Sequence, residues 1–303
     1  MANELISIAE MEKAAPIFRG RAGNAFARWL LKISDVTAVQ HLYDGAECDN
    51  APDTAAALVK GLDLKYTVAH EEYLEQLSSG PFITISNHPI GSMDGVILAD
   101  YMGHKFPGYK LLVNKFLMRI EALRPSFIPV VPTLEERTGP KAESVSGIRI
   151  AREHLLAGQP LGLFPSGAVS DWLAGRPPVV ELPASTDYIP DSLKGQTPPL
   201  RYTEPKVRDR DWQMPIVKFI RKAAVPVLPI RFFDGNTKFF YMLGTLHGWK
   251  IRTLRLPHEV MTKRGQTIRM GLGPVITPEQ QAACKTLAEL RTLLRASVYS
   301  QSL

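Results

Sequence analysis

The sequence predicts an α/β fold, with a mixed, largely parallel, twisted sheet flanked by helices and preceded by a helical N-terminal segment. The chain has 303 residues, of which 45% are hydrophobic and 22% are charged, so it can bury a sizeable core. From residue 63 onward, strand-length apolar runs alternate with helical patterns, as is typical of layered α/β folds. We therefore expect an N-terminal helical segment at 1–62 and a larger domain at 63–303.

The individual elements follow from these patterns. Strands are expected at 65–68, 82–86, 111–113, 127–131, 161–164, 225–232 and 239–243. Helices are expected near 70–78, 91–103, 115–123, 141–157, 212–223 and 278–297. The last helix has the clearest start, because Thr277 can cap it, Pro278 suits its first position and Gln280 can complete a capping box.

Residues 171–211 differ from the rest of the larger domain. They contain seven prolines, with tyrosines and charged residues between them. Because proline removes a backbone donor, little regular structure is expected here. Long stretches of this kind are usually functional or disordered, so we expect an excursion over the surface that acts as a lid or shapes a binding site.

The segment at 13–32 is basic and amphipathic. It holds five lysines and arginines and no acidic residue. Helical spacing places Phe26, Trp29, Leu30 and Ile33 on one apolar face. Two interpretations stay open: the helix lies on an anionic membrane surface, or it packs on the core with its arginines in water.

Composition narrows the partners and the compartment. The net charge of +6 is compatible with nucleic acid, anionic lipid or phosphorylated substrates. No dense basic cluster occurs beyond the N-terminal segment, so nucleic acid is not expected as a partner. The N-terminus does not resemble a secretory signal, and no apolar run reaches membrane-spanning length. Cys48 and Cys284 are far apart, so we expect a cytoplasmic protein with free thiols and no metal site.

The segment 82–95 is the most informative for chemistry. An apolar strand runs into Asn87 and His88, and a proline and Gly91 then allow the chain to turn before Asp94. This places His88 at the carboxyl end of a strand and Asp94 near the start of a helix, at the edge where open α/β sheets bind ligands. A carboxylate beside a histidine can fix its tautomer and steady its charged form, as in general-base catalysis. The bland alternative is a chance pairing in which His88 is a turn residue.

A second strand exit occurs at 161–170, where the chain reads Phe164-Pro165-Ser166-Gly167 after an apolar run. A turn of this kind can direct backbone N–H groups at an anion or at a carbonyl oxygen. By itself the pattern equally fits a plain strand exit.

Together these segments resemble the lysophosphatidic acid and glycerol-3-phosphate acyltransferase superfamily. Asn87, His88 and Asp94 match its first motif, residues 164–170 match its third, and 225–230 match its fourth, an apolar strand with two prolines. The second motif corresponds to Asn114 and Lys115 with the strand that follows. The reading Asn-His-Pro-x-Gly-x-x-Asp-Gly is closer to a bacterial, hemolysin-like subgroup, which also has a Trp helix before the fourth motif and a Gly-Asn element after it, here Trp212 and Asp234-Gly235-Asn236.

The resemblance implies an acyltransferase domain that needs no cofactor. Its co-substrate would be acyl-CoA or acyl carrier protein, and its acceptor a lysolipid hydroxyl reached at the cytoplasmic face of a membrane. His88 would be the general base and Asp94 would orient it, with backbone donors near Gly167 holding the oxyanion. The implied substrate-binding residues are Asn87, Gly91, Asn114, Lys115, Phe164, Pro165, Ser166 and Gly167.

The third motif departs from the family pattern at two positions. Ser166 stands where most members have Glu, and Val169 where many have an Arg that helps to hold the acceptor's phosphate. These departures put a phosphate-bearing acceptor in doubt. They also keep open a non-catalytic lipid-binding protein on the same fold. A hydrolase that uses water as acceptor is a third possibility, although no Gly-x-Ser-x-Gly elbow is present.

Overall fold

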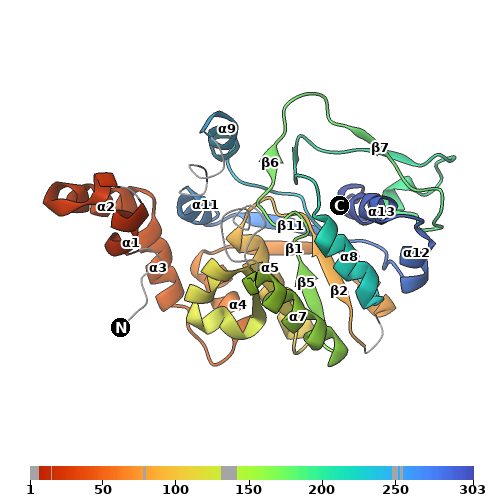
Figure 1. Ribbon diagram of the computed structural model, residues 1–303, viewed down its shortest axis with the longest axis horizontal. Coiled ribbons are helices and arrows are strands. Elements are labelled where there is room, and N and C mark those ends of the chain that lie inside the picture. Colours follow the sequence, from red (N-terminus) through yellow and green to blue (C-terminus); the bar gives the residue numbers. More distant parts are fainter. Residues whose placement is uncertain (1–6, 15, 78–79, 131–141, 248–251, 253–254) are drawn as a thin grey trace.

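The computed structural model describes residues 7–14, 16–77, 80–130, 142–247, 252 and 255–303. Its centre is a seven-stranded sheet in the order β1-β11-β10-β2-β5-β3-β4 (Figure 1). These strands are β1 (Lys65–Ala69), β2 (Ile83–Ser86), β3 (Lys110–Asn114), β4 (Phe127–Val130), β5 (Leu161–Leu163), β10 (Val227–Phe232) and β11 (Thr267–Leu272).

The strand directions make the sheet mixed but mainly parallel. β10, β2, β5, β3 and β4 all run the same way, so their carboxyl ends share one edge. β11 is antiparallel to β10 and parallel to β1. These two strands, at one side of the sheet, therefore run in the opposite direction to the other five. The predicted fold class is therefore confirmed.

Helices cover both faces of the sheet because its strands are apolar on both sides. One face, with Leu111 of β3 and Leu228 of β10, packs against α4 (Ala51–Gly61) and α5 (Ser92–Lys105). The other face, with Leu112 of β3 and Val227 of β10, packs against the remaining large helices. These are α7 (Ala142–Leu156), α8 (Met214–Ala223) and α13 (Leu287–Tyr299).

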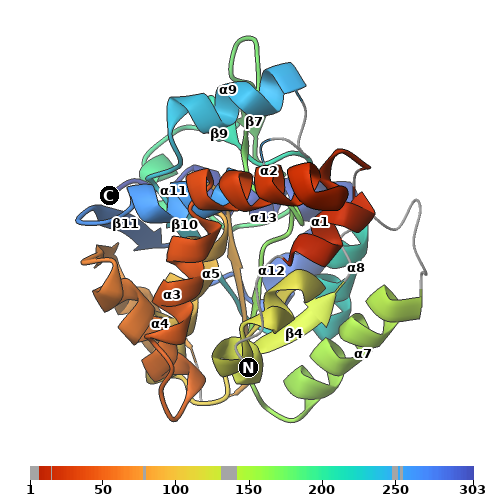
Figure 2. The same ribbon diagram turned by 90° about the vertical axis from the view of Figure 1, so that its left-hand side faces the viewer.

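The N-terminal segment consists of helices, as expected. They are α1 (Ile8–Ala14), the 3-10 helix η1 (Pro16–Phe18), α2 (Gly20–Ile33) and α3 (Val36–Asp44), and they project from one end of the sheet domain (Figures 1 and 2). α4 is different, because Ala55 and Leu58 lie fully buried in the main core. The core of the sheet domain thus begins before residue 63, since α4 completes the layer formed by α5.

Most expected strands and helices are present, but the prediction of a strand at 239–243 is wrong. This run lies inside the helix α9 (Lys238–His247). The Thr237 hydroxyl accepts a hydrogen bond from the N–H of Phe240 and so caps the helix. Phe240 and Tyr241 are buried while Phe239 and Met242 are exposed, which is helical rather than alternating spacing.

Other differences are local. β11 was not predicted, and α11 (Leu256–Thr262) precedes it. The helix at 278–297 is two helices, α12 (Pro278–Ala283) and α13, because Thr286 caps a second start. The expected helices at 70–78 and 115–123 are 3-10 turns: η2 (Glu71–Gln76), η3 (Lys115–Arg119) and η4 (Glu121–Ser126). Ser78, Val131 and Lys141, at the ends of three predicted elements, lie outside the described residues.

The Pro-rich excursion at 171–211 runs over the surface but contains more regular structure than its prolines suggested. β6 (Asp171–Trp172) pairs with β9 (Val207–Arg208), and β7 (Val179–Glu181) pairs with β8 (Arg201–Thr203), both antiparallel. A 3-10 turn, η5 (Asp191–Leu193), lies between the inner strands. The excursion is therefore a long hairpin whose two ends meet at β6 and β9. No helix in the described part of the chain is long and apolar enough to span a membrane.

Candidate active site

The candidate site lies at the carboxyl ends of three neighbouring parallel strands. His88 follows β2, which lies between β10 and β5 in the sheet. Phe164 follows β5, and its ring lies 4.1 Å from the His88 imidazole, measured between centroids. The strand ends thus bring the first and third sequence motifs into contact at the edge that the sequence predicted.

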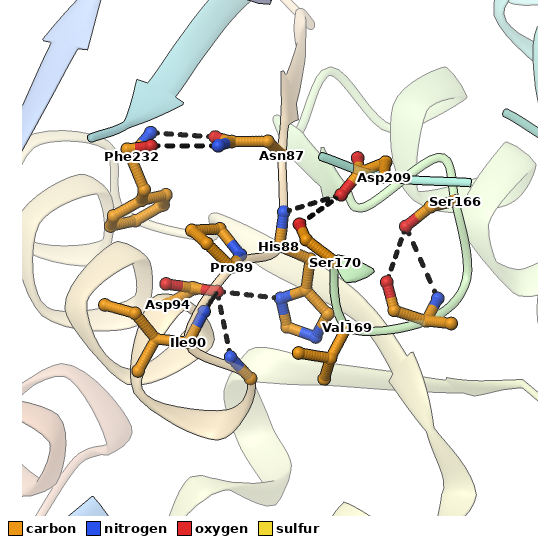
Figure 3. A network of polar contacts seen from close by, with 12 residues as sticks. Asn87, His88, Pro89, Ile90, Asp94, Ser166, Val169, Ser170, Asp209 and Phe232 are labelled. Carbon is orange, nitrogen blue, oxygen red and sulfur yellow. Dashed lines mark hydrogen bonds and ion pairs between the residues drawn. The ribbon is translucent and has the colours of Figure 1, made fainter. Parts of the chain in front are cut away.

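His88 and Asp94 come together as an ion pair. Nδ1 of His88 lies 3.0 Å from Oδ2 of Asp94, although the ring N–H is not well aligned on the carboxylate. Figure 3 shows the His88 ring facing the Asp94 carboxylate. The Asp94 carboxylate is fully buried, whereas 18% of the His88 side chain is exposed. Catalytic hydrogen bonds often tighten only when substrate binds. Nδ1 faces Asp94, so Nε2 is the ring nitrogen that this carboxylate leaves free of contact.

The loop that carries His88, residues 88–91, has a hydrogen bond at each of its backbone N–H and carbonyl groups. Oδ2 of Asp94 also accepts hydrogen bonds from the N–H groups of Ile90 and Gly91, at 2.9 and 3.0 Å. The carbonyl of Pro89 accepts a bond from the Tyr241 hydroxyl, and the carbonyl of Ile90 accepts one from Nδ2 of Asn236. The Gly91 carbonyl accepts the N–H of Asp94. These bonds leave the loop little freedom, so they fix the direction in which the imidazole projects.

His88 itself is bound at both backbone groups. Its N–H donates to Oδ1 of Asp209 at 3.3 Å, and its carbonyl accepts the N–H of Ser170 at 2.8 Å. Asp209, Tyr241 and Asn236 all lie more than 120 residues from the loop, and the sequence reasoning missed their role. Only the Gly-Asn element after the fourth motif gave a signal for Asn236.

Asn87 has a structural role that differs from the substrate contact expected for it. Its Nδ2 donates to the carbonyl of Phe232 and its Oδ1 accepts the N–H of Phe232, both at 2.8 Å. The side chain is 95% buried and both of its amide groups are used. A primary amide has one donor side and one acceptor side, as a backbone peptide group does, so Asn87 links the end of β2 to the end of β10 as a strand residue would. Because both sides of the amide are used, Asn87 is not available to a substrate.

Gly91 is required by the geometry of the turn. Its φ of +94° is one that L side chains rarely adopt. An added Cβ would also lie 3.1 Å from the side chain of Leu256 and 3.3 Å from that of Val169. Gly91 lets the chain turn sharply so that Asp94 returns beneath His88.

The 164–170 loop closes largely on itself. Ser166 is buried, and its hydroxyl donates to the carbonyl of Ala168 at 2.7 Å. The Gly167 N–H donates to the Phe164 carbonyl at 2.9 Å, and the Ala168 N–H points at the Ser166 hydroxyl at 3.4 Å. The N–H groups of Gly167 and Ala168 are thus engaged within the turn. The N–H of Gly167 therefore holds the shape of the turn, and the expectation that backbone donors near Gly167 hold an oxyanion stays a prediction.

Gln213, at the start of α8, anchors this loop from outside. Its N–H donates to the carbonyl of Pro165, and its Nε2 donates to the carbonyl of Ser166, both at 3.0 Å. Gly167 has a φ of +66°, and a Cβ there would lie 2.1 Å from Nε2 of Gln213. Pro165, Ser166 and Gly167 therefore shape the loop, while the ring of Phe164 packs against the His88 imidazole.

Asn114, the last residue of β3, and Lys115, the first residue of η3, lie at the same sheet edge, but β5 separates β3 from β2. Both residues are exposed, and the Asn114 side chain caps η3 by accepting the N–H of Phe116. The structure thus places them on the rim of the edge, two strands from His88.

Arg252 is the cation that braces the loop around Val169. Its guanidinium donates to the carbonyls of Val169 and Ser170, at 3.1 and 3.0 Å, and pairs with Asp171. Only 5% of its side chain is exposed, and burial lowers the pKa of the guanidinium. Arg252 therefore supports the backbone where many superfamily members carry an arginine side chain.

The aromatic face of α2 points away from the core. Phe26 and Trp29 are 41% and 55% exposed, and their rings stack at 5.7 Å. The small residues Gly23 and Ala27 are buried instead. The alternative in which these aromatic residues pack on the core is therefore wrong. Ile33, assigned to the same face, has a side chain that lies outside the described residues.

Comparison with known proteins agrees with the motifs. A family model for acyltransferases matches residues 10–199, which include both loops of the site. A lyso-glycine lipid O-acyltransferase from Bacteroides thetaiotaomicron is 24% identical over 253 residues, covering 82% of this chain and 79% of its own length. A protein of the same name from Phocaeicola vulgatus is 25% identical over 254 residues, with 82% and 77% covered.

A solved structure is also similar. The crystal structure of the 1-acyl-sn-glycerophosphate acyltransferase PlsC from Thermotoga maritima matches with a TM-score of 0.42 and 14% identity, covering 90% of this chain and 86% of that one. The family model itself spans well over half of the 303 residues. This chain therefore belongs to the acyltransferase family.

Proposed function

We propose that this enzyme transfers a fatty acyl group from the thioester of acyl-CoA or acyl carrier protein to a hydroxyl of a lysolipid-type acceptor. The observation that carries the proposal is the 3.0 Å contact between Nδ1 of His88 and the buried Asp94 carboxylate. A carboxylate in that position holds the proton on Nδ1 and leaves Nε2 as the base. The part-exposed imidazole at the ends of β2 and β5 is open to an acceptor hydroxyl.

The reaction then needs no covalent enzyme intermediate. Nε2 of His88 takes the proton of the acceptor hydroxyl as its oxygen attacks the thioester carbonyl. The new C–O bond forms a tetrahedral intermediate, and its collapse breaks the C–S bond. The departing thiolate takes the proton back from His88, so the enzyme returns to its starting state. Asp94 stabilises the imidazolium that exists between the two proton transfers.

We propose an acceptor that carries no phosphate. Position 166 is a serine whose hydroxyl is bound within its own loop, and position 169 is an apolar Val169. The nearby guanidinium of Arg252 is already bound to two backbone carbonyls and to Asp171. A phosphate would need a free cation at this place. The names of the two curated relatives, lyso-glycine lipid O-acyltransferases, favour an amino-acid lysolipid.

We further propose that the enzyme works as a peripheral protein on the cytoplasmic face of a membrane. The exposed rings of Phe26 and Trp29 provide an apolar contact. Exposed basic side chains flank them on the same segment: Arg19, Arg21, Arg28 and Lys32. Aromatic residues beside basic ones are the combination that binds anionic bilayer surfaces.

The replacement His88→Ala tests the catalytic proposal. Acyl transfer from acyl-CoA and from acyl carrier protein is measured to a lyso-glycine lipid and to lysophosphatidic acid. We expect the wild-type protein to prefer the lyso-glycine lipid and His88→Ala to lose about 10²–10⁴-fold in kcat. The exposed His41 of α3 provides the control, since His41→Ala should keep full activity. Unchanged turnover in His88→Ala would sink the mechanism.

The same assay separates the two alternatives. A non-catalytic lipid-binding protein would bind the lysolipid and release no thiol from either donor. A hydrolase would release thiol and free fatty acid at the same rate with or without acceptor. The close approach of His88 to Asp94 favours the transferase over the lipid-binding alternative, since a binding protein has no need of that pair.

A further inference from the structure

Asp209 reaches the His88 loop from the far end of the Pro-rich excursion. It follows β9 directly and is fully buried. Oδ1 of its carboxylate accepts a hydrogen bond from the Ser170 hydroxyl at 2.5 Å and one from the backbone N–H of His88 at 3.3 Å. Figure 3 shows the three residues converging on one side of the loop, opposite the Asp94 side.

Asp209 and Ser170 together clamp the backbone of His88. Ser170 completes the arrangement because its own N–H donates to the His88 carbonyl at 2.8 Å. One group of His88 is thus bound directly by Asp209, and the other is bound through Ser170. Both ends of the excursion therefore meet at the residue that the catalytic proposal depends on.

Asp209 is itself held firmly. Oδ2 accepts the indole N–H of Trp212 at 2.9 Å. The Asp209 N–H donates to the Tyr299 hydroxyl at 2.7 Å, and its carbonyl accepts a bond from Arg295 at 2.8 Å. Tyr299 and Arg295 both belong to α13, which packs on the sheet. The excursion alone does not fix Asp209, because the core of the domain does so too.

The ionised form of Asp209 suits these contacts. Burial raises the pKa of its carboxyl, and the Ser170 hydroxyl, Arg295, Trp212 and His88 offset this rise only in part. Three donors point at the two oxygens, and a protonated acid would place a fourth hydrogen among them. The geometry therefore matches a carboxylate that only accepts hydrogen bonds.

We propose that Asp209 is a positioning residue for the acyl transfer, which sets His88 by binding its N–H directly and its carbonyl through Ser170. This inference rests on the proposed role of His88 as general base. The backbone of His88 determines where Nε2 lies relative to the acceptor hydroxyl. A displacement of about 1 Å in such a group can cost about 100-fold in rate.

The variants Asp209→Asn, Asp209→Leu and Ser170→Ala test the inference. Asparagine keeps an acceptor oxygen for Ser170 and His88, so we expect kcat to fall about tenfold, whereas leucine removes every acceptor and should cost about 100-fold. Ser170→Ala should lie close to Asp209→Asn. KM for donor and acceptor should stay within about twofold in all three, because neither residue is placed against a substrate.

Glu204→Gln is the matched control. Glu204 is also a buried carboxylate of the excursion, paired with Arg295 and Arg208, and it does not bond the His88 loop. We expect this variant to lose thermal stability while its kcat per folded enzyme stays within about twofold of wild type. A purely structural role for Asp209 would give the same pattern in Asp209→Asn and would overturn the inference.

A last comparison uses the His88→Ala background. Because Asp209 acts through His88, Asp209→Asn should add no further loss to the residual rate of His88→Ala. An additional tenfold loss there, or a wild-type kcat in both Asp209→Asn and Ser170→Ala, would contradict the inference. If His88→Ala lowers turnover but the Asp209 and Ser170 variants give either of these contradicting results, the inference about Asp209 fails and the proposed function stands. If His88→Ala keeps full turnover, the proposed function fails first. Should Asp209→Leu not fold, the other two variants decide.

Discussion

The side-chain amide of Asn87 makes two 2.8 Å hydrogen bonds with the backbone of Phe232, 145 residues further along the chain. The pair extends the contact between β2 and β10 by one residue beyond the end of β2, to the last residue of β10. It holds the sheet edge together at the point where the chain turns into His88. Asn87 is therefore a structural residue of the site, and its loss affects stability before it affects chemistry.

We expect Asn87→Ala to lower the free energy of unfolding by about 2–4 kcal/mol, because it leaves the buried N–H and carbonyl of Phe232 unpaired. Asn87→Asp keeps the acceptor for the N–H and should lie between wild type and Asn87→Ala. Urea denaturation of the three proteins measures the order. Equal stability in all three would mean that water or another group replaces the amide.

Asp94→Asn should separate the charge of Asp94 from its structural role. An asparagine oxygen can still accept the N–H groups of Ile90 and Gly91, so α5 should begin at the same residue. The neutral amide cannot stabilise an imidazolium, and we expect kcat to fall about 10³–10⁴-fold. Steady-state kinetics and thermal denaturation measure the two effects.

Asp100→Asn is the control for this change. Asp100 lies on the same helix, is also largely buried, and bonds the Tyr66 hydroxyl and His104 rather than His88. Its replacement should leave kcat unchanged. A comparable loss of activity in both variants would point to damage to α5 and not to a role of the Asp94 charge.

His104 should make the stability of the fold depend on pH. Its hydrogen bond with Asp53 of α4 and its bond with the Asp100 carbonyl raise its pKa above 6.5, and partial burial opposes them. Because the pKa of His104 is higher in the folded than in the unfolded state, His104 contributes to the stability of the fold. This contribution is complete below the unfolded-state pKa of 6.5 and is lost as the pH rises through the folded-state pKa. The difference in Tm between wild type and His104→Ala should therefore be larger at pH 5.5 than at pH 9. A difference that grows toward alkaline pH would contradict this.

Phe26→Glu combined with Trp29→Glu tests the membrane-binding proposal. Burying each aromatic ring in a bilayer stabilises binding by about 1.5–3 kcal/mol, so the double variant should bind at least tenfold more weakly. Co-sedimentation with liposomes of rising anionic lipid content measures it, and wild-type binding should increase along the series. Leu156→Glu, which changes a 73% exposed leucine at the end of α7, should bind like wild type. If wild-type binding does not depend on the anionic lipid content of the liposomes, the basic segment does not contribute to membrane binding.

Local patterns in the sequence determined six of the seven strands of the central sheet, the order of the motifs and the pairing of His88 with Asp94. These features depend on residues that are close in the chain, and only five residues lie between His88 and Asp94. The pattern also placed His88 and Phe164 at carboxyl ends of strands, whereas the strand order of the sheet brought the two rings into contact. The apolar run at 239–243 was ambiguous, since short apolar runs fit a strand or a helix, and the Thr237 cap and the burial of Phe240 decided it.

Only the tertiary structure decided what holds the site. Asp209, Tyr241 and Phe232 lie 121, 152 and 145 residues from the residues that they bind. No spacing rule connects such positions, because their contacts arise from how the excursion, α9 and β10 fold back onto β2. The same folding turned the Gly167 N–H into the loop and the rings of Phe26 and Trp29 toward solvent. The proximity of His88 to Asp94 was predictable from the sequence, whereas the framework that orients the His88 imidazole was not.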